Sequence, residues 1–368
     1  MKTGVILFNL GGPADLKSVR GFLFNLFADK AIIGAPFFIR LPLALLISTL
    51  RNKKAQAIYK SLGGGSPLLS KTEEQRAALE DVLNKSARPV VREGGEPERT
   101  EGMAHEYKVT IAMRYAPPRV KAAVHALKRW GAERVVFLPM YPQHSKSTTG
   151  SSFAEAEKAL KNALNLTPSL ACCYPEMDGF AQASAARIRP AYEKLAAEAA
   201  AKNLPAPRLL LSAHGLPQRM IDAGDPYASQ CQQSAAAIVA ALGIPGLDWR
   251  LCYQSRVGPL EWIKPYTENE IEEAGKAGKP LLIAPLAFTA DNSETLYEID
   301  MLYRDLAAAK GCPAFAPVPC VGAHPLFIAG LAGLVKSAQT SENGVFCPAS
   351  PGACCGRKCG LQSRASHA

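Results

Sequence analysis

The sequence lacks the features that mark nucleic-acid-binding and nucleotide-binding proteins, and it lacks an uninterrupted membrane-spanning run. Its formal net charge is +10, but no basic stripe interleaved with aromatic residues and no known nucleic-acid motif accompanies it, so we expect no nucleic-acid partner. The glycine turn GGP at residues 11–13 lacks the GxGxxG spacing of a dinucleotide-binding loop. The most apolar window, residues 31–50, contains Pro36, Arg40 and Pro42, and we do not expect it to cross a bilayer.

The start of the chain also lacks the pattern of a signal peptide, because MKTGVILFNLGGP runs directly into a predicted strand and turn. We therefore expect a cytoplasmic protein. In such a compartment the ten cysteines are expected to be thiols or metal ligands rather than disulfides. Four of them lie in a Pro/Gly-rich segment whose glycines allow thiolates to converge, which suits an iron–sulfur cluster or zinc, with unligated thiols as the alternative. These four are Cys347, Cys354, Cys355 and Cys359.

What is present describes a globular protein of two domains. The chain has 368 residues, 48% of them hydrophobic and 20% charged, which is long for a single core. Apolar strands alternate with helical segments in both halves, and VILFNLGGP resembles LLLSAHGLP, so we predict two α/β domains that face each other. The expected units are an N-terminal domain over residues 1–150, a C-terminal domain over 151–319, a helix over 320–345 that packs back on the N-terminal domain, and a cysteine-rich tail over 346–368.

Three carboxylates follow a buried strand near the end of the second half. Residues 281–288 form an apolar run without charge, which is typical of a strand covered on both faces. The helix that follows places Asp291, Glu294 and Glu298 at i, i+3 and i+7, on one face. Because ligands bind beyond the carboxyl ends of parallel strands, this face is a candidate site. The alternative is a solvated acidic helix start, which the helix dipole favours.

His214 follows another apolar strand, residues 209–211, and precedes Gly215. We expect its side chain at the carboxyl edge of the sheet, as a candidate base or metal ligand. The alternative is a histidine that satisfies a loop backbone. The other histidines show no metal-ligand spacing to His214, which disfavours a zinc hydrolase.

The apolar residues 31–50 are followed at once by Arg51, Lys53 and Lys54. Apolar residues flanked by cations are typical of a segment that dips into a membrane surface, with the cations at the headgroups. We therefore expect peripheral contact with the inner membrane through this segment. A buried helical pair under a loop is the alternative.

A set of motifs resembles one family. SAHGLPQRMIDAGDPY, YPQHSKSTTGSS, YQSRVGP and APLAFTADNSETLYEID closely resemble the signatures of the ferrochelatases, and NLGGP, YKSLGGGSP and MRY fit as well. The matches run in the family's order from Gly4 to about Leu334. The resemblance implies two Rossmann-like domains that clamp a porphyrin and insert Fe²⁺ as the metal substrate, with protoporphyrin IX converted to haem. The alternatives are a coproporphyrin ferrochelatase, cobalt insertion, and a non-catalytic haem or iron–sulfur sensor on the same fold.

The resemblance also implies roles for individual residues. His214 and Glu294 are the family's central catalytic and metal-contacting pair, and a neutral imidazole can accept a pyrrole proton. Asp291 and Glu298 would continue a polar path away from the ring, since close carboxylates share protons readily. Arg114 would bind a propionate, because guanidinium and carboxylate pair bidentately. The residues that the resemblance places along the porphyrin are Leu10, Tyr59, Arg114, Tyr115, Tyr141 and Ser147.

Two positions depart from the family pattern. Many members have a histidine where this chain has Asn292, so a metal or proton role there would be lost or moved. Animal members take an iron–sulfur ligand from the position of Lys146, which cannot bind a cluster. Some members carry a 2Fe–2S cluster on a C-terminal tail, and this tail resembles theirs. We expect a 2Fe–2S cluster on the four tail cysteines, with Cys172 or Cys173 as a substitute ligand. A homodimer is compatible with the sequence.

Overall fold

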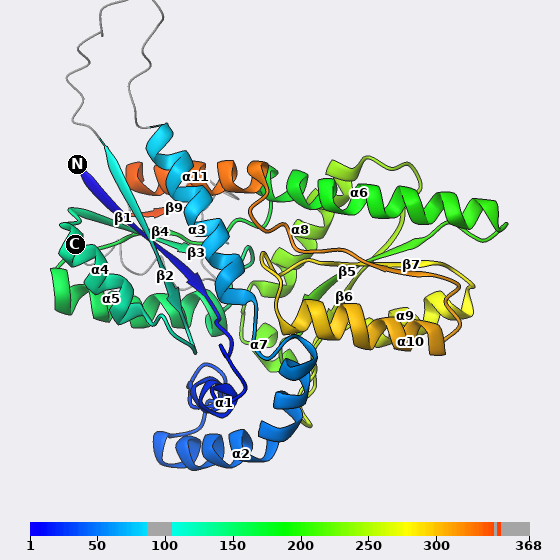
Figure 1. The fold of residues 1–368 in the computed structure, drawn as a ribbon, viewed down its shortest axis with the longest axis horizontal. Helices are drawn as coiled ribbons and strands as arrows, with labels where there is room; N and C mark the ends of the chain where they lie inside the picture. Colours follow the sequence, from blue (N-terminus) through cyan, green and yellow to red (C-terminus); the bar gives the residue numbers. More distant parts are fainter. Residues whose placement is uncertain (87–104, 342–343, 347–368) are drawn as a thin grey trace, which may run out of the picture.

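The computed structural model describes residues 1–86, 105–341 and 344–346. The four cysteines of the tail therefore lie outside the described residues. The described chain forms two parallel sheets, which lie beside each other in Figure 1 with helices packed around them. The predicted α/β class is confirmed.

The first sheet has the strand order β2-β1-β3-β4-β9, and every neighbouring pair is parallel. The interior strand β1 is buried along almost its whole length, as expected for a strand covered by helices on both faces. The strands are β1 (Lys2–Asn9), β2 (Glu106–Met113), β3 (Arg134–Pro139), β4 (Ser169–Ala171) and β9 (Val345–Phe346), and the helices that follow them in this half are α3 (Leu68–Lys85), α4 (Val120–Trp130) and α5 (Ser151–Leu164).

The second sheet has the order β6-β5-β7-β8, again all parallel. Strands β5 and β7 are buried apart from His214 at the end of β5. The strands are β5 (Arg208–His214), β6 (Asp248–Gln254), β7 (Leu281–Pro285) and β8 (Phe315–Pro317), and the helices are α6 (Asp178–Ala201), α7 (Gln218–Asp222), α8 (Tyr227–Leu242), α9 (Thr267–Lys276) and α10 (Tyr303–Ala309). Because the strands are parallel, the carboxyl ends of β5, β6 and β7 meet at one edge.

We expected the first domain to end at residue 150, but its sheet continues beyond that point. Helix α5 packs against α4, and β4 and β9 both belong to the first sheet. The end of the described chain therefore returns to the sheet with which the chain begins.

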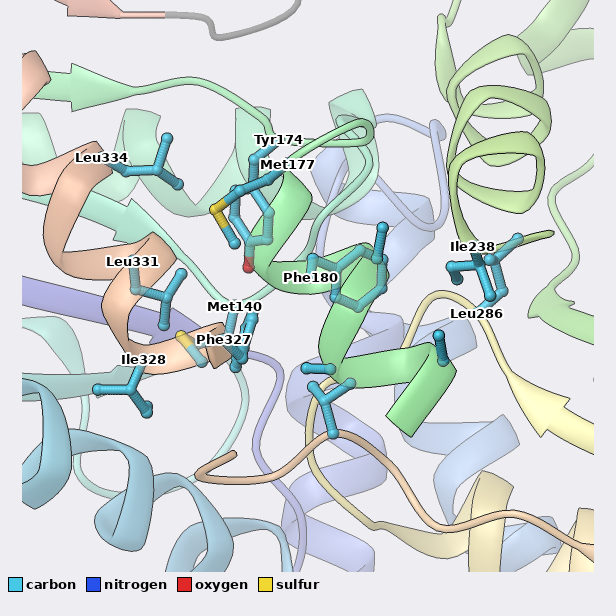
Figure 2. Close-up of a cluster of buried hydrophobic side chains, with 14 of the residues drawn as sticks. Met140, Tyr174, Met177, Phe180, Ile238, Leu286, Phe327, Ile328, Leu331 and Leu334 are labelled. Atoms are coloured by element: carbon cyan, nitrogen blue, oxygen red, sulfur yellow. The ribbon is translucent and has the colours of Figure 1, made fainter. Parts of the chain in front are cut away.

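The two halves share one core. The largest buried cluster contains Val5 of β1 and Leu209 of β5, and it also takes in α11 (Pro325–Thr340). Helix α11 packs against α3 of the first half and against α6 of the second. The helix that we expected to pack on the N-terminal domain therefore contacts both halves. Figure 2 shows the aromatic part of this cluster, where the rings of Tyr174, Phe180 and Phe327 contact one another.

Helices α1 (Val19–Phe27) and α2 (Phe37–Ser61) form a pair that lies apart from the sheets at the bottom of Figure 1. In the first half of α2 only Ala44 and Ser48, one turn apart, are buried. The apolar side chains around them are exposed, with Phe38 at 74% and Leu50 at 72%. Within the described part of the chain, no helix combines the length and apolar character needed to cross a membrane.

The crossing of α6 and α11 gives a stability prediction. A Cβ atom added at Gly179 would lie 2.4 Å from the carbonyl oxygen of Leu326, whereas a Cβ at Gly333 would meet nothing within 4 Å. We expect Gly179→Ala to lower the free energy of unfolding by about 1–3 kcal/mol, because the backbones must separate. Gly333→Ala, the control on α11, should leave it unchanged or raise it by up to about 1 kcal/mol through helix propensity. Urea denaturation measures both, and equal effects would contradict the close crossing.

Candidate active site

The end of β5 fixes the orientation of His214. Its Nδ1 lies 2.7 Å from the carbonyl oxygen of Gly215. Because a carbonyl oxygen only accepts hydrogen bonds, the neutral ring carries its proton on Nδ1, and Nε2 is left with a lone pair. The hydroxyl of Tyr227 donates to the carbonyl oxygen of His214 at 2.8 Å, which holds the backbone at this point.

Aromatic side chains border the imidazole. The ring centroid of His214 lies 6.3 Å from that of Trp262 and 6.4 Å from that of Phe288. Gly215 permits this arrangement, since a Cβ there would lie 3.1 Å from an atom of the Trp262 ring. The base nitrogen thus lies beside apolar surface, and the imidazole itself is partly exposed.

Gln254 connects this histidine to the carboxylate-bearing segment. It is the parallel partner of His214 at the end of β6 and is fully buried. Its side chain accepts a hydrogen bond from Ser212 at 2.6 Å and donates to the carbonyl oxygen of Glu294 at 3.1 Å. The same amide donates to Glu298 at 3.0 Å. One side chain therefore holds β5, β6 and the segment of Glu294 together.

The segment of Glu294 is a π-helix, η2 (Glu294–Leu302). Helical structure here was predicted, but its i→i+5 hydrogen bonding changes which side chains share a face. Asn292 begins it with reciprocal bonds: its Oδ1 accepts from the N–H of Thr295 at 3.1 Å, and its own N–H donates to the Thr295 hydroxyl at 3.0 Å. This is a capping box, so Asn292 stabilises the helix start.

The three carboxylates have different hydrogen-bond partners. Asp291 accepts from the backbone N–H of Cys320 at 3.1 Å and from the hydroxyl of Thr295 at 3.2 Å. Glu298 accepts from the side chain of Gln254, from the N–H and hydroxyl of Ser255, and from the hydroxyl of Tyr303. That they share one face stays a prediction. Their part in a polar path stays a prediction.

A residue of the first half reaches Glu294. The hydroxyl of Tyr59, near the end of α2, lies 3.4 Å from the hydroxyl of Ser293, which donates to Glu294 at 2.9 Å. Burial and the charge of Glu294 raise the pKa of Tyr59 well above its usual value, so its hydroxyl stays protonated. Tyr59 is thus linked to the carboxylate of Glu294 through Ser293.

Arg114 is already engaged by two carboxylates. Its guanidinium pairs with Asp29 at 2.7 Å and with Glu155, and only 15% of its side chain is exposed. Burial lowers the pKa of Arg114, but Asp29 and Glu155 outweigh that effect and raise it. Tyr115 donates to the same oxygen of Asp29 at 2.8 Å. A propionate would have to compete with these partners, and the propionate role stays a prediction.

The hydroxyl-rich turn after β3 is held by the second half. It forms a short π-helix, η1 (Lys146–Gly150). The buried carboxylate of Asp225 accepts from the Ser145 hydroxyl at 3.0 Å and from the Lys146 N–H at 2.8 Å, and Ser145 in turn bonds Ser147. Ser147 is thereby fixed at the junction of the two halves.

The remaining predicted residues lie at strand ends of the first sheet. Leu10 follows β1 and is partly buried, and Tyr141 follows β3 and is buried. The possible substitute ligands Cys172 and Cys173 are both buried just after β4.

Sequence reasoning missed several residues that shape this site. Gln254 and Asp225 lie inside motifs that were recognised, YQSRVGP and GDPY, but nothing in a sequence says which donors a buried amide or carboxylate will meet. Ser293 lies inside the motif APLAFTADNSETLYEID, and its bond to Glu294 was not predicted either. Two carboxylates pair with Arg114, and both lie in segments that match no motif: Asp29 and Glu155.

Comparisons with known proteins identify a family for this chain. The model of the Ferrochelatase family matches residues 2–339. Proteins named ferrochelatase from Phenylobacterium zucineum and Caulobacter vibrioides are each 44% identical to this chain, over 365 and 359 residues; both alignments cover 98% of this chain, and they cover 99% and 95% of the relatives. A ferrochelatase from Rickettsia bellii is 42% identical over 335 residues, covering 91% of this chain and 86% of that protein.

A solved structure has the same fold. SirB from Bacillus subtilis, determined with Fe³⁺, superimposes with a TM-score of 0.52 at 14% identity, covering 94% of this chain and 98% of SirB. At that identity the likeness concerns the fold alone.

Proposed function

Because the chain belongs to the ferrochelatase family, we propose that it inserts Fe²⁺ into protoporphyrin IX to give haem, with His214 and Glu294 as the central pair. The observation that carries the proposal is the hydrogen bond from His214 Nδ1 to the carbonyl of Gly215. It leaves Nε2 free to accept a proton, and Gln254 connects the same strand edge to Glu294.

The chemistry needs two pyrrole protons to leave as the metal enters. His214 Nε2 accepts a proton or contacts iron, since a neutral imidazole does either. Glu294 takes the complementary role with an oxygen ligand, which suits Fe²⁺ as it sheds water. The aromatic faces of Trp262 and Phe288 beside His214 offer the apolar surface that a flat macrocycle requires.

Metal insertion tests this proposal. We expect the purified chain to form protohaem from Fe²⁺ and protoporphyrin IX without oxygen. His214→Ala and Glu294→Gln should each lower kcat by about 100-fold or more, the contribution of a positioned proton-transfer group. Asp300→Asn is the matched control for the carboxylate, because Asp300 lies on η2 but pairs with Arg304 at the surface. It should retain parental activity.

Four results would change the proposal. Absence of metal insertion by the parent would point to a non-catalytic haem or iron–sulfur sensor, whereas full activity of His214→Ala would remove His214 from the central pair. Faster turnover of coproporphyrin would favour that substrate, and insertion of Co²⁺ but not Fe²⁺ would change the metal.

We also propose that the exposed side of α2 contacts the inner-membrane surface from the cytoplasm. Phe38 and Leu50 are largely exposed, and the exposed cations Arg51, Lys53 and Lys54 follow directly. Apolar side chains insert among the acyl chains while the cations meet anionic headgroups.

Vesicle sedimentation tests the contact. The protein should sediment with phosphatidylglycerol vesicles, less at high salt, and Phe38→Asp should reduce the bound fraction several-fold by placing a charge among the acyl chains. Leu326→Asp is the control, since Leu326 is 48% exposed at the start of α11. Equal loss in both variants, or binding unaffected by either, would contradict the assignment.

A 2Fe–2S cluster on the tail is a further proposal. Among the described residues no group of three or more His, Cys, Asp or Glu side chains could hold a metal, so Cys347, Cys354, Cys355 and Cys359 must supply most ligands. Support comes from the point where the described chain stops: the carbonyl of Phe346 accepts a hydrogen bond from the N–H of Cys172 at 2.9 Å. Phe346, the last described residue, therefore lies beside the segment that carries the two buried thiols directly after β4. Self-association stays a prediction.

The visible spectrum of anaerobically purified protein tests the cluster. We expect charge-transfer absorbance that disappears in Cys347→Ser. If a β4 thiol is a ligand, Cys172→Ser or Cys173→Ser also loses it. Cys312→Ser, a half-buried thiol of the other half, should keep it. A colourless parent with full activity would reject the cluster and leave the enzyme.

A further inference from the structure

Ser293 directly precedes η2 and already has helical backbone angles, and its hydroxyl makes no capping bond. The start of this helix is already satisfied by the reciprocal bonds of Asn292 and Thr295. A serine at a helix start normally gives its oxygen to the backbone N–H two or three residues on. Here the hydroxyl is available for another partner, and that partner is Glu294.

The two glutamates of η2 are held very differently. Glu298 accepts from three residues, as described above. For the Glu294 carboxylate, the structure records one hydrogen bond in the described chain, from Ser293 at 2.9 Å. A carboxylate can accept about four hydrogen bonds. Ser293 therefore orients the group while leaving most of its acceptor positions open.

The direction of the bonds follows from counting hydrogens. Ser293 has one hydroxyl hydrogen, and it points to Glu294. Its oxygen can then only accept from Tyr59, 3.4 Å away. The order is Tyr59 to Ser293 to Glu294, from α2 in the first half to η2 in the second.

Tyr59 is a firm anchor for this chain of bonds. It is 7% exposed and packs with Val19 and Leu23 of α1. The N–H of Gly64 donates to its carbonyl oxygen at 2.8 Å. Tyr59 therefore moves with the α1–α2 pair.

We propose that Ser293 is a positioning residue, which orients the Glu294 carboxylate and, through Tyr59, ties it to helix α2. The inference rests on the proposed function of Glu294. The proposal makes the position of helices α1 and α2 part of the catalytic geometry, although the Glu294 carboxylate itself lies on η2.

Steady-state kinetics on the full chain test this inference. Ser293→Ala should lower kcat for Fe²⁺ insertion about tenfold, since a loosely held group reacts from fewer productive geometries, with the porphyrin KM little changed. Ser293→Thr, which keeps the hydroxyl, should restore most of kcat. Ser70→Ala is the control and should match the parent, because Ser70 is an exposed residue of α3 whose hydroxyl donates to the carbonyl oxygen of Pro67.

A double-mutant cycle separates positioning from simple packing. Tyr59→Phe should lower kcat less than Ser293→Ala, and should have no further effect once Ser293 is alanine, because the two hydroxyls act in series. Additive effects, parental kcat in Ser293→Ala, or failure of threonine to restore kcat would overturn the proposal.

Crystal structures of the parent and Ser293→Ala keep the two proposals distinguishable. If the parent inserts no metal, the proposed function fails. The positioning by Ser293 is then still tested by the orientations of the Glu294 side chain in the two structures. We expect one Glu294 orientation in the parent and several in the variant. The same single orientation in both would overturn the inference.

Discussion

The buried amide of Gln254 is the contact on which the site depends. Parallel pairing places it beside His214, and its side chain bonds Ser212 of β5, the backbone of Glu294 and the carboxylate of Glu298. An amide is suited to this position because it accepts on one side and donates twice on the other. An apolar residue of the same size would leave buried partners unsatisfied, at about 1–3 kcal/mol for each group. The strand edge and the π-helix are therefore held as one unit, although they are about forty residues apart in the chain.

The polar residues around Gln254 are of two kinds. Some have their hydrogen-bonding positions occupied by protein donors and fix neighbouring elements, and others keep positions open for a proton or a metal. Glu298 and Asp291 have their acceptor positions occupied by backbone and side-chain donors, so they fix η2 to β6 and to the segment before α11. Glu294 keeps most of its acceptor positions, and His214 keeps Nε2 after Nδ1 is used. A group that must bind and release a proton or metal cannot have all its positions satisfied by the protein. The two residues that the family resemblance singled out are the two that the hydrogen bonding leaves open.

Much of this could be predicted from the sequence, and the remainder has a physical reason. Apolar strands alternating with helices determine an α/β fold, and strand ends determine where His214 and Glu294 lie, because both follow from local patterns. The π-helical form of η2 could not be predicted, since it depends on tertiary contacts such as those of Glu298. The domain limit at residue 150 failed for a related reason: β9 pairs with β4 across a long separation that no local signal encodes. The partners of Arg114 were missed because Asp29 and Glu155 meet it only in the folded chain.

The two departures from the family pattern become structural features here. Asn292 cannot supply an imidazole, but as a capping residue it satisfies the start of η2 and so frees the Ser293 hydroxyl for Glu294. Lys146 cannot ligate a cluster, but its N–H bonds Asp225 and its ammonium group donates to the carbonyl of Ala223 at 3.3 Å. Both bonds cross from the first half to the second, beside Ser147. Lys146 thus adds a side-chain contact between the two halves, and Asn292 adds bonds within the start of one helix, while the catalytic roles of His214 and Glu294 stay a proposal.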